Sequence, residues 1–258
     1  MEIYVRFCPI QNRIKPYLVI LNRNWNNNYG RSRLVGKIKE SYSGNIEICK
    51  ATSVSENFLG KRLFDIFIAS FGVITFFCVF VLFFPIYMLG ENKGHPLYKQ
   101  KRIGKDGKYF YIYKFRSMIK HADEKLKNNP ELYQKYIDNN YKLEPSEDPR
   151  ITNFGKFIRR TSLDEIPQFI NVLRGEMSIV GPRPIVEEEL KEYGELKETF
   201  LQMKPGITGV WQVNGRSNVG YPERCELELS YLSKRGLIFD SWVVLVTIYH
   251  VFQKRGAF

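Results

Sequence analysis

Two adjacent carboxylates, Asp164 and Glu165, stand in the stretch of the chain whose residue types are best suited to chemistry. Arg159 and Arg160 precede the pair, and Arg183 follows it. Guanidinium groups bind phosphate through paired, charge-assisted hydrogen bonds, so this stretch would bring carboxylates and phosphate-binding groups together. The simpler explanation is that acidic residues in the first turn of a helix only cap that helix.

The residues around the acidic pair predict a helix that begins at it. Thr161 and Ser162 are good N-caps, and Ser162 has capping-box spacing to Glu165. Pro167 suits a helix start, apolar residues then recur at helical spacing, and Gly175 is a natural terminator. Both carboxylates are therefore expected near a helix N-terminus, where unpaired N–H groups and the helix dipole favour negative charge.

An uncharged run at residues 66–90, IFIASFGVITFFCVFVLFFPIYMLG, precedes this stretch. At about 1.5 Å per residue it is long enough to cross the hydrocarbon core of a bilayer. Basic residues outnumber acidic ones on both of its flanks, so both flanks are expected on the cytoplasmic side. A re-entrant hairpin broken at Pro85 satisfies this bias, whereas a single span does not. A buried helix of a soluble domain is the alternative.

Composition narrows the class of protein. A chain of 258 residues with 44% apolar content can bury one substantial core. The net charge of +12 indicates an anionic partner: nucleic acid, an acidic membrane surface or a phosphorylated substrate. The four cysteines lack CxxC spacing, which argues against a zinc site or a disulfide scaffold and suits a reducing compartment. No cleavable signal peptide is visible in the first twenty residues.

The remaining pattern predicts an α-rich α+β fold with short strands. Residues 1–60 are expected to be an accessory segment, partly disordered, and residues 61–258 the main domain. Residues 104–107 read as a turn between short strands, and the aromatic and basic residues that follow suit either single-stranded nucleic acid or, beside an apolar anchor, a membrane surface. The other predicted elements are a helix pair at 118–141 broken at 128–130, a basic helix at 155–160, a charged helix at 185–203, a glycine-punctuated loop or hairpin at 204–217, and helices at 222–235 and 241–253.

Several short sequence motifs, taken in order along the chain, resemble those of the bacterial sugar transferases. These are the monotopic polyprenyl-phosphate hexose-1-phosphate transferases, and the resemblance is to their small form. The matching segments are Lys61-Arg62-x-x-Asp65, Gln100-x-Arg102-x-Gly104, Lys114-Phe115-Arg116-Ser117-Met118, Asp148-Pro149-Arg150-Ile151-Thr152, Thr161-Ser162-Leu163-Asp164-Glu165-Ile166-Pro167-Gln168, Met177-Ser178-Ile179-Val180-Gly181-Pro182-Arg183-Pro184 and Lys204-Pro205-Gly206-Ile207-Thr208-Gly209. Because so many motifs occur in the same order, the resemblance is specific, and it covers roughly residues 61–258.

The resemblance implies transfer of a sugar-1-phosphate from a UDP-sugar to undecaprenyl phosphate or another polyprenyl phosphate, with release of UMP. Such a reaction starts the assembly of exopolysaccharide, capsule, O-antigen or glycoprotein glycans at the cytoplasmic face of the bacterial inner membrane. It also implies Mg²⁺ as cofactor, with Asp164 as the nucleophile that forms a phospho-sugar intermediate and with Asp164 and Glu165 as metal ligands. Asp164 is expected to be ionised at pH 7, while Glu165 either binds the metal or assists proton movement.

Other residues are candidates for binding the substrates. Arg183, held between Pro182 and Pro184, is preorganised to contact the phosphate or uridine of the nucleotide, and Gln168 belongs to the motif of the acidic pair. Five basic residues suit the same work, lipid headgroups or plain solvation: Arg102, Lys114, Arg116, Arg159 and Arg160.

Two rival functions remain open at this point. A non-catalytic membrane adaptor of a glycan assembly complex would keep its function without Asp164. A basic nucleic-acid-binding protein would show strong, salt-dependent binding, but the apolar anchor and the acidic pair argue against nucleic acid as a partner. The sequence leaves the transferred sugar open, and also whether the chain forms a homo-oligomer.

Overall fold

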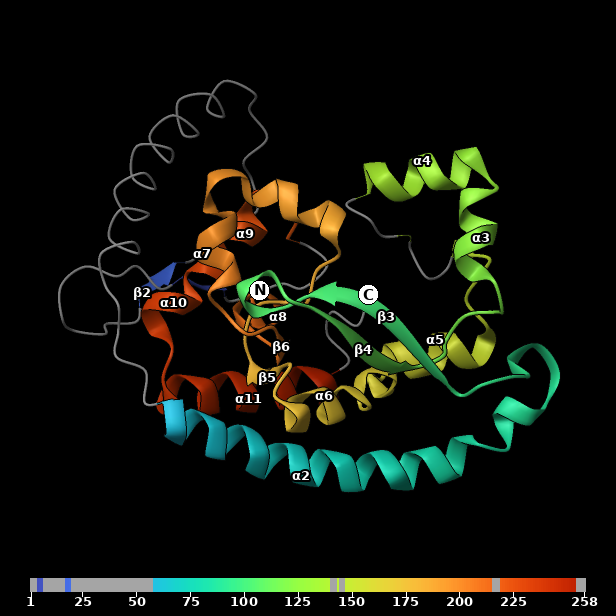
Figure 1. The fold of residues 1–258 in the computed structure, drawn as a ribbon, viewed down its shortest axis with the longest axis horizontal. Coiled ribbons are helices and arrows are strands. Elements are labelled where there is room, and N and C mark those ends of the chain that lie inside the picture. Colours follow the sequence, from blue (N-terminus) through green and yellow to red (C-terminus); the bar gives the residue numbers. More distant parts are fainter. Residues whose placement is uncertain are drawn as a thin grey trace. The chain divides into compact units, whose positions relative to one another are not determined.

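The computed structural model describes residues 4–6, 17–19, 58–139, 143, 147–214 and 219–253. The chain divides into two units, residues 1–48 and residues 49–258. In the first unit, strands β1 (Tyr4–Arg6) and β2 (Tyr17–Val19) pair in antiparallel fashion. The predicted accessory or disordered character of residues 1–60 otherwise lies outside the described residues. The second unit is rich in helices and holds short two-stranded sheets, which confirms the predicted fold class (Figure 1).

The apolar run forms a single helix, α2 (Phe58–Phe83), which is long and apolar enough to cross a membrane by length and composition. Helix α2 continues unbroken to Phe83 and ends just before Pro85, the residue at which the break was predicted. The re-entrant path through one leaflet stays a prediction. Pro85 follows the helix and begins the 3₁₀ turn η1 (Ile86–Met88), since proline lacks the N–H that a further helical turn would need. Gly72 lies mid-helix, where an added Cβ would stand 2.2 Å from the ring of Phe169 and prevent close packing.

The N-terminal end of α2 is held by buried charges. Lys61 Nζ lies 2.6 Å from Asp240 Oδ2. One oxygen of Asp65 accepts hydrogen bonds from Ser178 Oγ at 3.0 Å and from the Ile179 N–H at 2.9 Å. These contacts join α2 to the sheet that precedes the GPRP turn and to the last helix of the chain.

Arg62 holds α2 to the helix after the acidic pair, α6 (Gln168–Arg174). Its guanidinium donates to the carbonyls of Val172 at 2.7 Å and Leu173 at 2.8 Å. These carbonyls belong to the last turn of α6, where the regular helical donors run out. The Val172 carbonyl also accepts from the Gly175 N–H at 2.9 Å. The Lys-Arg-x-x-Asp motif before the apolar run therefore attaches α2 to the rest of the second unit.

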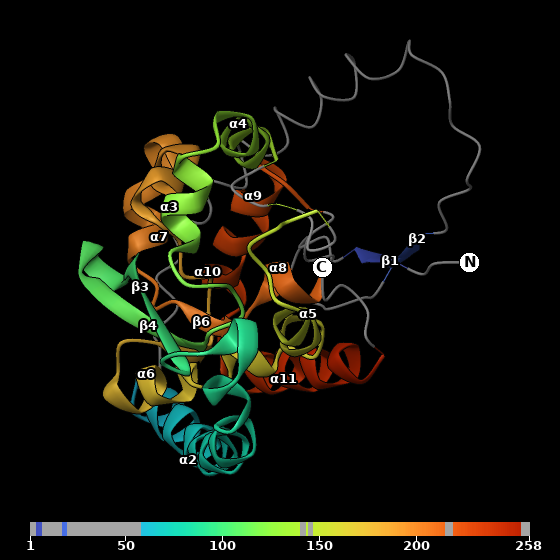
Figure 2. The ribbon, with the colours of Figure 1, turned by 90° about the vertical axis from the view of Figure 1, so that its right-hand side faces the viewer.

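The predicted strand–turn–strand segment is confirmed. Strands β3 (Leu97–Ile103) and β4 (Tyr109–Phe115) form an antiparallel hairpin in which Leu97 pairs with Phe115 and Ile103 with Tyr109. The turn between them, Lys105–Gly107, places Asp106 in the left-handed region at φ 58°. Figure 2 shows the hairpin extending from α6 on the side away from α2.

The helices that follow the hairpin are close to those predicted. Helices α3 (Ala122–Lys127) and α4 (Pro130–Asp138) form the expected pair, with Asn129 capping α4 by accepting from the Leu132 N–H at 3.1 Å. The basic helix α5 (Asn153–Arg160) follows and is capped by Thr152.

Strands β5 (Ser178–Val180) and β6 (Gly206–Thr208) pair in parallel, so the predicted loop or hairpin at 204–217 is wrong. Within that range β6 is followed by the short helix α8 (Val210–Val213). Gly206 explains the close pairing, because an added Cβ would stand 2.2 Å from the backbone nitrogen of Gly181. The end of the predicted loop or hairpin, residues 215–217, lies outside the described residues.

The predicted charged helix at 185–203 is also not continuous. A 3₁₀ segment, η5 (Glu187–Leu196), is interrupted at Gly194, where φ is 49°, and is followed by α7 (Lys197–Leu201). Glycine adopts this left-handed conformation without steric cost, so the chain changes direction there.

The C-terminal part of the described chain is helical: α9 (Glu223–Leu229), α10 (Tyr231–Lys234) and α11 (Leu237–Phe252). In both views α11 lies on the same side of the second unit as α2, with α6 beside α2 (Figures 1 and 2). Both helices keep large apolar side chains exposed, among them Val81 at 70% and Ile238 at 90%. Two helices with exposed apolar residues therefore run along one side of this unit.

Candidate active site

The acidic pair lies on a 3₁₀ turn, η4 (Leu163–Glu165), which precedes α6. The predicted capping box is wrong: Ser162 adopts φ 56°, and its side chain makes no capping hydrogen bond to any described residue. Pro167 is the N-cap residue of α6 and already has helical backbone angles. The helix itself begins at Gln168. Asp164 and Glu165 therefore do not occupy the first turn of α6. Gly175 ends α6 in the left-handed conformation, as predicted, at φ 81°.

Asp164 is buried, with 8% of its surface exposed. The pKa of Asp164 is raised from 3.8 to about 6. Burial is the main cause, Lys114 and Arg159 oppose the rise, and the charge of Glu165 contributes to it. A pKa of about 6 leaves roughly nine-tenths of the carboxyl groups ionised at pH 7. Asp164 is thus ionised as expected, but as a desolvated carboxylate held by cations and not as a helix-capping one.

Glu165 is held by a cation from the neighbouring hairpin. Lys114 Nζ, on β4, lies 2.7 Å from Glu165 Oε1. Both side chains line one cleft. The cleft therefore carries a cation and a carboxylate immediately next to the buried Asp164.

The walls of this cleft come from six parts of the chain: β3, β4, the turn η4, the start of α6, the GPRP turn and the β6–α8 segment. The lining residues are Arg102, Ile112, Lys114, Glu165, Gln168, Arg183, Pro184, Gly206, Ile207 and Gln212. Six of these were singled out in the sequence, and the fold brings them together from positions up to 82 residues apart (184 − 102).

Three predicted residues lie elsewhere. Arg116 donates to the carbonyls of Asn92 and His95 and so holds the chain where it returns from α2. Arg159 donates from Nε to Ser117 Oγ at 2.8 Å, and it is close enough to Asp164 to lower the pKa of that carboxyl. Arg160 is exposed on α5.

The GPRP turn is fixed by its backbone. The carbonyl of Pro182, which is buried, accepts from the Gly206 N–H at 2.8 Å. The Arg183 N–H donates to Glu228 Oε1 at 3.2 Å, while the Arg183 guanidinium lies 5.7 Å from the centre of the Trp211 ring. Arg183 therefore reaches the cleft from an anchored turn, as its two flanking prolines suggested.

Arg102 forms the opposite part of the polar wall and is buried. Its Nη2 donates to Gln100 Oε1 at 2.6 Å, and its Nη1 lies 3.5 Å from Glu189 Oε1. The pKa of Arg102 is lowered to about 10, mainly by burial and then by the nearby charge of Arg183, while Glu189 opposes the fall. Two guanidinium groups therefore stand close together at the cleft, which favours a ligand with more than one negative charge.

Sequence reasoning missed several residues that shape this site. Gln212 lines the cleft, and its Oε1 is buried with no hydrogen-bond partner among the described residues. Glu189, Arg224 and Glu228 form a buried charge network behind the cleft. In the sequence, these residues belong to stretches that resemble solvated helical surfaces, so only the fold reveals them.

The acidic pair fits a magnesium ion that is completed by substrate oxygens. Among the described residues, no group of three or more His, Cys, Asp or Glu side chains is placed to hold a metal by itself. Mg²⁺, however, is commonly held by one or two carboxylates together with substrate phosphates and water. Glu165 at the cleft and the adjacent Asp164 supply such a partial set beside groups suited to phosphate.

Comparison with known proteins gives a consistent result. Residues 56–254 match the family described as bacterial sugar transferase. The chain is 39% identical over 204 residues to the exopolysaccharide production protein ExoY of Sinorhizobium fredii, which covers 78% of this chain and 88% of that protein. It is 40% identical over 208 residues to a UDP-galactose-lipid carrier transferase of Erwinia amylovora, covering 79% of this chain and 42% of that protein. It is 37% identical over 211 residues to the undecaprenyl-phosphate galactose phosphotransferase of Salmonella typhimurium, covering 79% and 44%.

Proposed function

The chain belongs to the bacterial sugar transferase family, and we propose that it moves a sugar-1-phosphate from a UDP-sugar to undecaprenyl phosphate or a similar polyprenyl phosphate, releasing UMP. Two relatives carry names for transfer to a lipid carrier or to undecaprenyl phosphate. The observation that carries the proposal is the convergence of Arg102, Lys114 and Arg183 with Glu165 in one cleft. Asp164 does not line that cleft and is buried directly beside Glu165 in the chain. The three cations can neutralise the charge of a bound diphosphate, and the buried carboxylate beside them can then attack one of its phosphorus atoms.

In the proposed mechanism, Asp164 is the nucleophile. Its carboxylate oxygen attacks the phosphorus that bears the sugar, the bond from that phosphorus to the UMP oxygen breaks, and UMP leaves with the bonding electrons. An oxygen of the polyprenyl phosphate then attacks the same phosphorus and releases Asp164 as a carboxylate. Burial of Asp164 supports this role, because a poorly solvated carboxylate sheds little water before it reacts.

The other cleft residues would orient and neutralise the substrates. Arg102 and Arg183 would hold the diphosphate oxygens, with Pro182 and Pro184 keeping Arg183 in place and Gln168 facing the same ligand. Lys114 would hold Glu165 and offset the charge of the incoming carboxylate.

We propose that Mg²⁺ is held by Glu165 and Asp164. A bound Mg²⁺ would neutralise part of the diphosphate charge. Glu165 also has a second open role, in which it accepts or returns a proton. If Glu165 binds the metal, Mg²⁺ affinity should fall in Glu165→Gln. If Glu165 only accepts or returns a proton, Mg²⁺ affinity should stay unchanged in that variant.

Membrane association is supported by the long apolar helix and by relatives that act on a lipid carrier. We place the protein at the bacterial inner membrane, with the cleft on the cytoplasmic face. The exposed apolar residues of α2 and α11 would face lipid, and Arg116 and Arg160 remain candidates for headgroup contacts. The reaction would be the first membrane step of exopolysaccharide, capsule or O-antigen assembly.

The test is UMP release by the purified full chain with Mg²⁺, a panel of UDP-sugars and polyprenyl phosphate. Lipid-dependent UMP release that disappears in Asp164→Asn is the expected result. Glu188→Gln, a change at an exposed carboxylate, is the matched control. Intact-mass measurement after mixing with donor alone should show a gain of one phospho-sugar in the wild type and none in Asp164→Asn.

Two outcomes would contradict the proposal. UMP release that persists in Asp164→Asn would remove Asp164 as the nucleophile. A folded wild-type protein that releases no UMP from any donor, while Asp164→Asn still supports glycan production in cells, would favour the adaptor function.

A further inference from the structure

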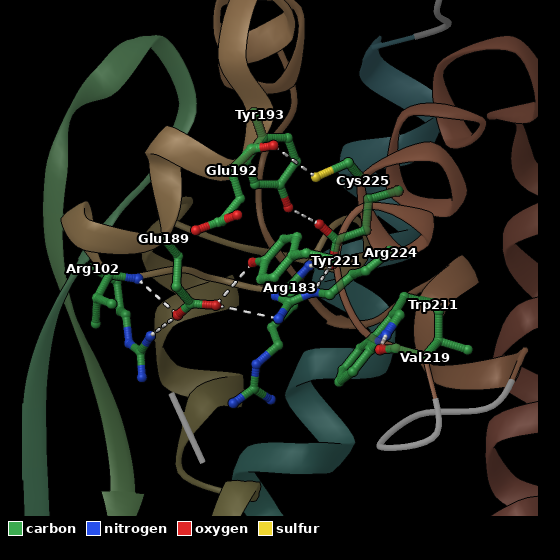
Figure 3. Close-up of polar contacts among 12 residues, drawn as sticks. Arg102, Arg183, Glu189, Glu192, Tyr193, Trp211, Val219, Tyr221, Arg224 and Cys225 are labelled. Atoms are coloured by element: carbon green, nitrogen blue, oxygen red, sulfur yellow. Dashed lines mark hydrogen bonds and ion pairs between the residues drawn. The ribbon is translucent and has the colours of Figure 1, made fainter. Parts of the chain in front are cut away.

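Behind the cleft lies a network of buried charges, of which the reaction outlined above uses Arg102 but not Glu189, Arg224 or Glu228 (Figure 3). It joins β3, the 3₁₀ segment η5 and helix α9. Glu189 on η5 and Arg224 on α9 are both buried, and Arg224 Nη1 lies 3.2 Å from Glu189 Oε2. Arg224 Nε lies 3.3 Å from Glu228 Oε1, an oxygen that also accepts from the Arg183 N–H.

Both oxygens of Glu189 are engaged on opposite sides. Oε2 accepts from Arg224 and from the Tyr221 hydroxyl at 3.0 Å. Oε1 accepts from the Val186 N–H at 3.3 Å and faces Arg102 Nη1 at 3.5 Å. One carboxylate thus connects an inner arginine, which does not line the cleft, with an outer arginine that does.

The charges explain why a carboxylate is stable at this point. Burial by itself would raise the pKa of Glu189, but Arg224, Arg183 and Arg102 together hold it below its usual range. Glu189 is therefore ionised at neutral pH, and it faces three cations. Without the negative charge of Glu189, less attraction would offset the repulsion between the guanidinium groups of Arg102 and Arg183.

The direction of the two outer arginines matters for the cleft. In Figure 3 the guanidinium groups of Arg102 and Arg183 both lie below the Glu189 carboxylate, on the side away from Tyr193. The Nε atom of Arg102 is buried without a hydrogen-bond partner among the described residues. The side chain of Arg102 is thus positioned by its contacts with Gln100 and Glu189.

We propose that Glu189 is a positioning residue that holds Arg102 beside Arg183, so that the two guanidinium groups together bind the diphosphate of the donor. The proposal rests on the proposed function for the identity of the ligand. Glu189 does not line the cleft and acts through Arg102. Arg224 backs Glu189 from inside the fold, and Glu228 ties the same network to the backbone of Arg183.

A purely structural role for Glu189 makes a different prediction. If the network only stabilised the fold, its loss would lower the fraction of folded enzyme. Apparent kcat would then fall while KM for the donor stayed unchanged, because the remaining folded molecules would bind as before. A positioning role raises KM for the donor and weakens binding of a diphosphate in protein that is fully folded.

The experiment measures UDP binding by calorimetry on the purified full chain, alongside lipid-dependent UMP release. Glu189→Gln removes the charge, and Glu189→Asp keeps it while shortening the reach toward Arg102, which guards against misfolding of the first variant. Glu188→Gln is the matched control, because Glu188 is exposed on the same 3₁₀ segment. We expect UDP affinity to fall about tenfold in both Glu189 variants and to change less than about twofold in the control.

A double-mutant cycle with Arg102→Gln tests whether Glu189 acts through Arg102. We expect Arg102→Gln to weaken UDP binding about tenfold and the added Glu189→Gln change to cost less than about twofold more. Full multiplication of the two losses would overturn the proposal. Unchanged UDP affinity in both Glu189 variants would also overturn it, whatever happens to kcat.

The binding measurement separates this inference from the proposed function. A wild-type protein that binds UDP with the expected dependence on Glu189, yet releases no UMP from any donor, would support the inference and contradict the reaction. A folded wild-type protein that binds no UDP, with or without Mg²⁺, would overturn the inference.

Discussion

Lys114 Nζ lies 2.7 Å from Glu165 Oε1 and so ties the β3–β4 hairpin to the turn that carries both acidic residues. The same ammonium group acts on Asp164. Burial raises the pKa of Asp164, and Lys114 is the largest influence that opposes this rise. The hairpin therefore controls the ionisation of the neighbouring carboxyl as well as lining the cleft.

The first prediction concerns the pH dependence of activity in Lys114→Met. Loss of the ammonium charge should raise the pKa of Asp164 above its present value of about 6. The acidic limb of the kcat/KM profile should then move to higher pH, in addition to any uniform loss of activity. Lys108→Met, at an exposed position of the same hairpin, should leave the limb in place. An unmoved limb in Lys114→Met would contradict the assigned coupling.

The second prediction is that Asp164→Asn stabilises the protein at neutral pH. The folded-state pKa of about 6 lies above the ordinary value of 3.8, so the folded state binds the proton more tightly than the unfolded state does. Stability from this group is present below pH 4 and is lost as the pH rises through about 6, at a cost of up to about 3 kcal/mol.

Thermal unfolding in EDTA should therefore show a higher Tm for Asp164→Asn than for wild type at pH 7, with the difference vanishing near pH 4. Glu188→Gln should show no such pH-dependent gain. A variant that is less stable than wild type at pH 7 would mean that the cations around Asp164 outweigh its burial.

The third prediction concerns the docking of α2. Asp65→Ala leaves Ser178 Oγ and the Ile179 N–H without their acceptor in the buried interface. Each unsatisfied group costs about 1–3 kcal/mol, so Tm should fall by several degrees. Asp65→Asn keeps an acceptor oxygen and should recover much of the loss. Equal losses in both variants would indicate that the charge of Asp65, and not its hydrogen bonds, holds the helix.

The fourth prediction uses the close pairing of β5 and β6. Gly206→Ala would place a methyl carbon 2.2 Å from the Gly181 nitrogen, so the backbone of the GPRP turn must shift. We expect a loss of about 1–3 kcal/mol together with weaker nucleotide binding. Gly236→Ala, where an added Cβ meets nothing within 4 Å, should be nearly neutral. Similar behaviour of the two variants would count against the tight pairing.

The fifth prediction concerns the apolar side of the second unit. Ile238 is 90% exposed at the start of α11, and Ile238→Glu should weaken adsorption to lipid if this side faces a membrane. Vesicle flotation without detergent measures the bound fraction, with Tyr133→Glu on α4 as the control. Equal flotation of wild type and Ile238→Glu would place α11 away from the lipid.

Much of the site could be predicted because short motifs retain their local character. The acidic pair and the GPRP turn stood out from their residue types, while Lys114 was one of five basic candidates. The fold places Lys114, Glu165 and Arg183 at one cleft. The hairpin and the helix pair were predictable from alternation and from turn residues. Each of these features depends mainly on neighbours within a few positions.

The errors have a common physical cause, which is that long-range contacts decided the local structure. Ser162 had the right spacing for a capping box, yet it adopts the left-handed conformation of the turn that leads into the acidic pair. Residues 204–217 read as a loop because nothing in that stretch indicates that Gly206 pairs with a strand near Ser178. Glu189 was not singled out within the predicted charged helix at 185–203, because its partners, Arg102 and Arg224, lie 87 and 35 positions away.

The bond between Lys61 and Asp240 spans 179 positions of the chain, and this has a consequence for biosynthesis. A ribosome makes Lys61 early, whereas Asp240 emerges only after the whole cleft has been translated. Until then Lys61 lacks its carboxylate partner, and the N-terminal end of α2 lacks this contact with α11. The docking of α2 is therefore completed only when the part of the chain that forms α11 has been made.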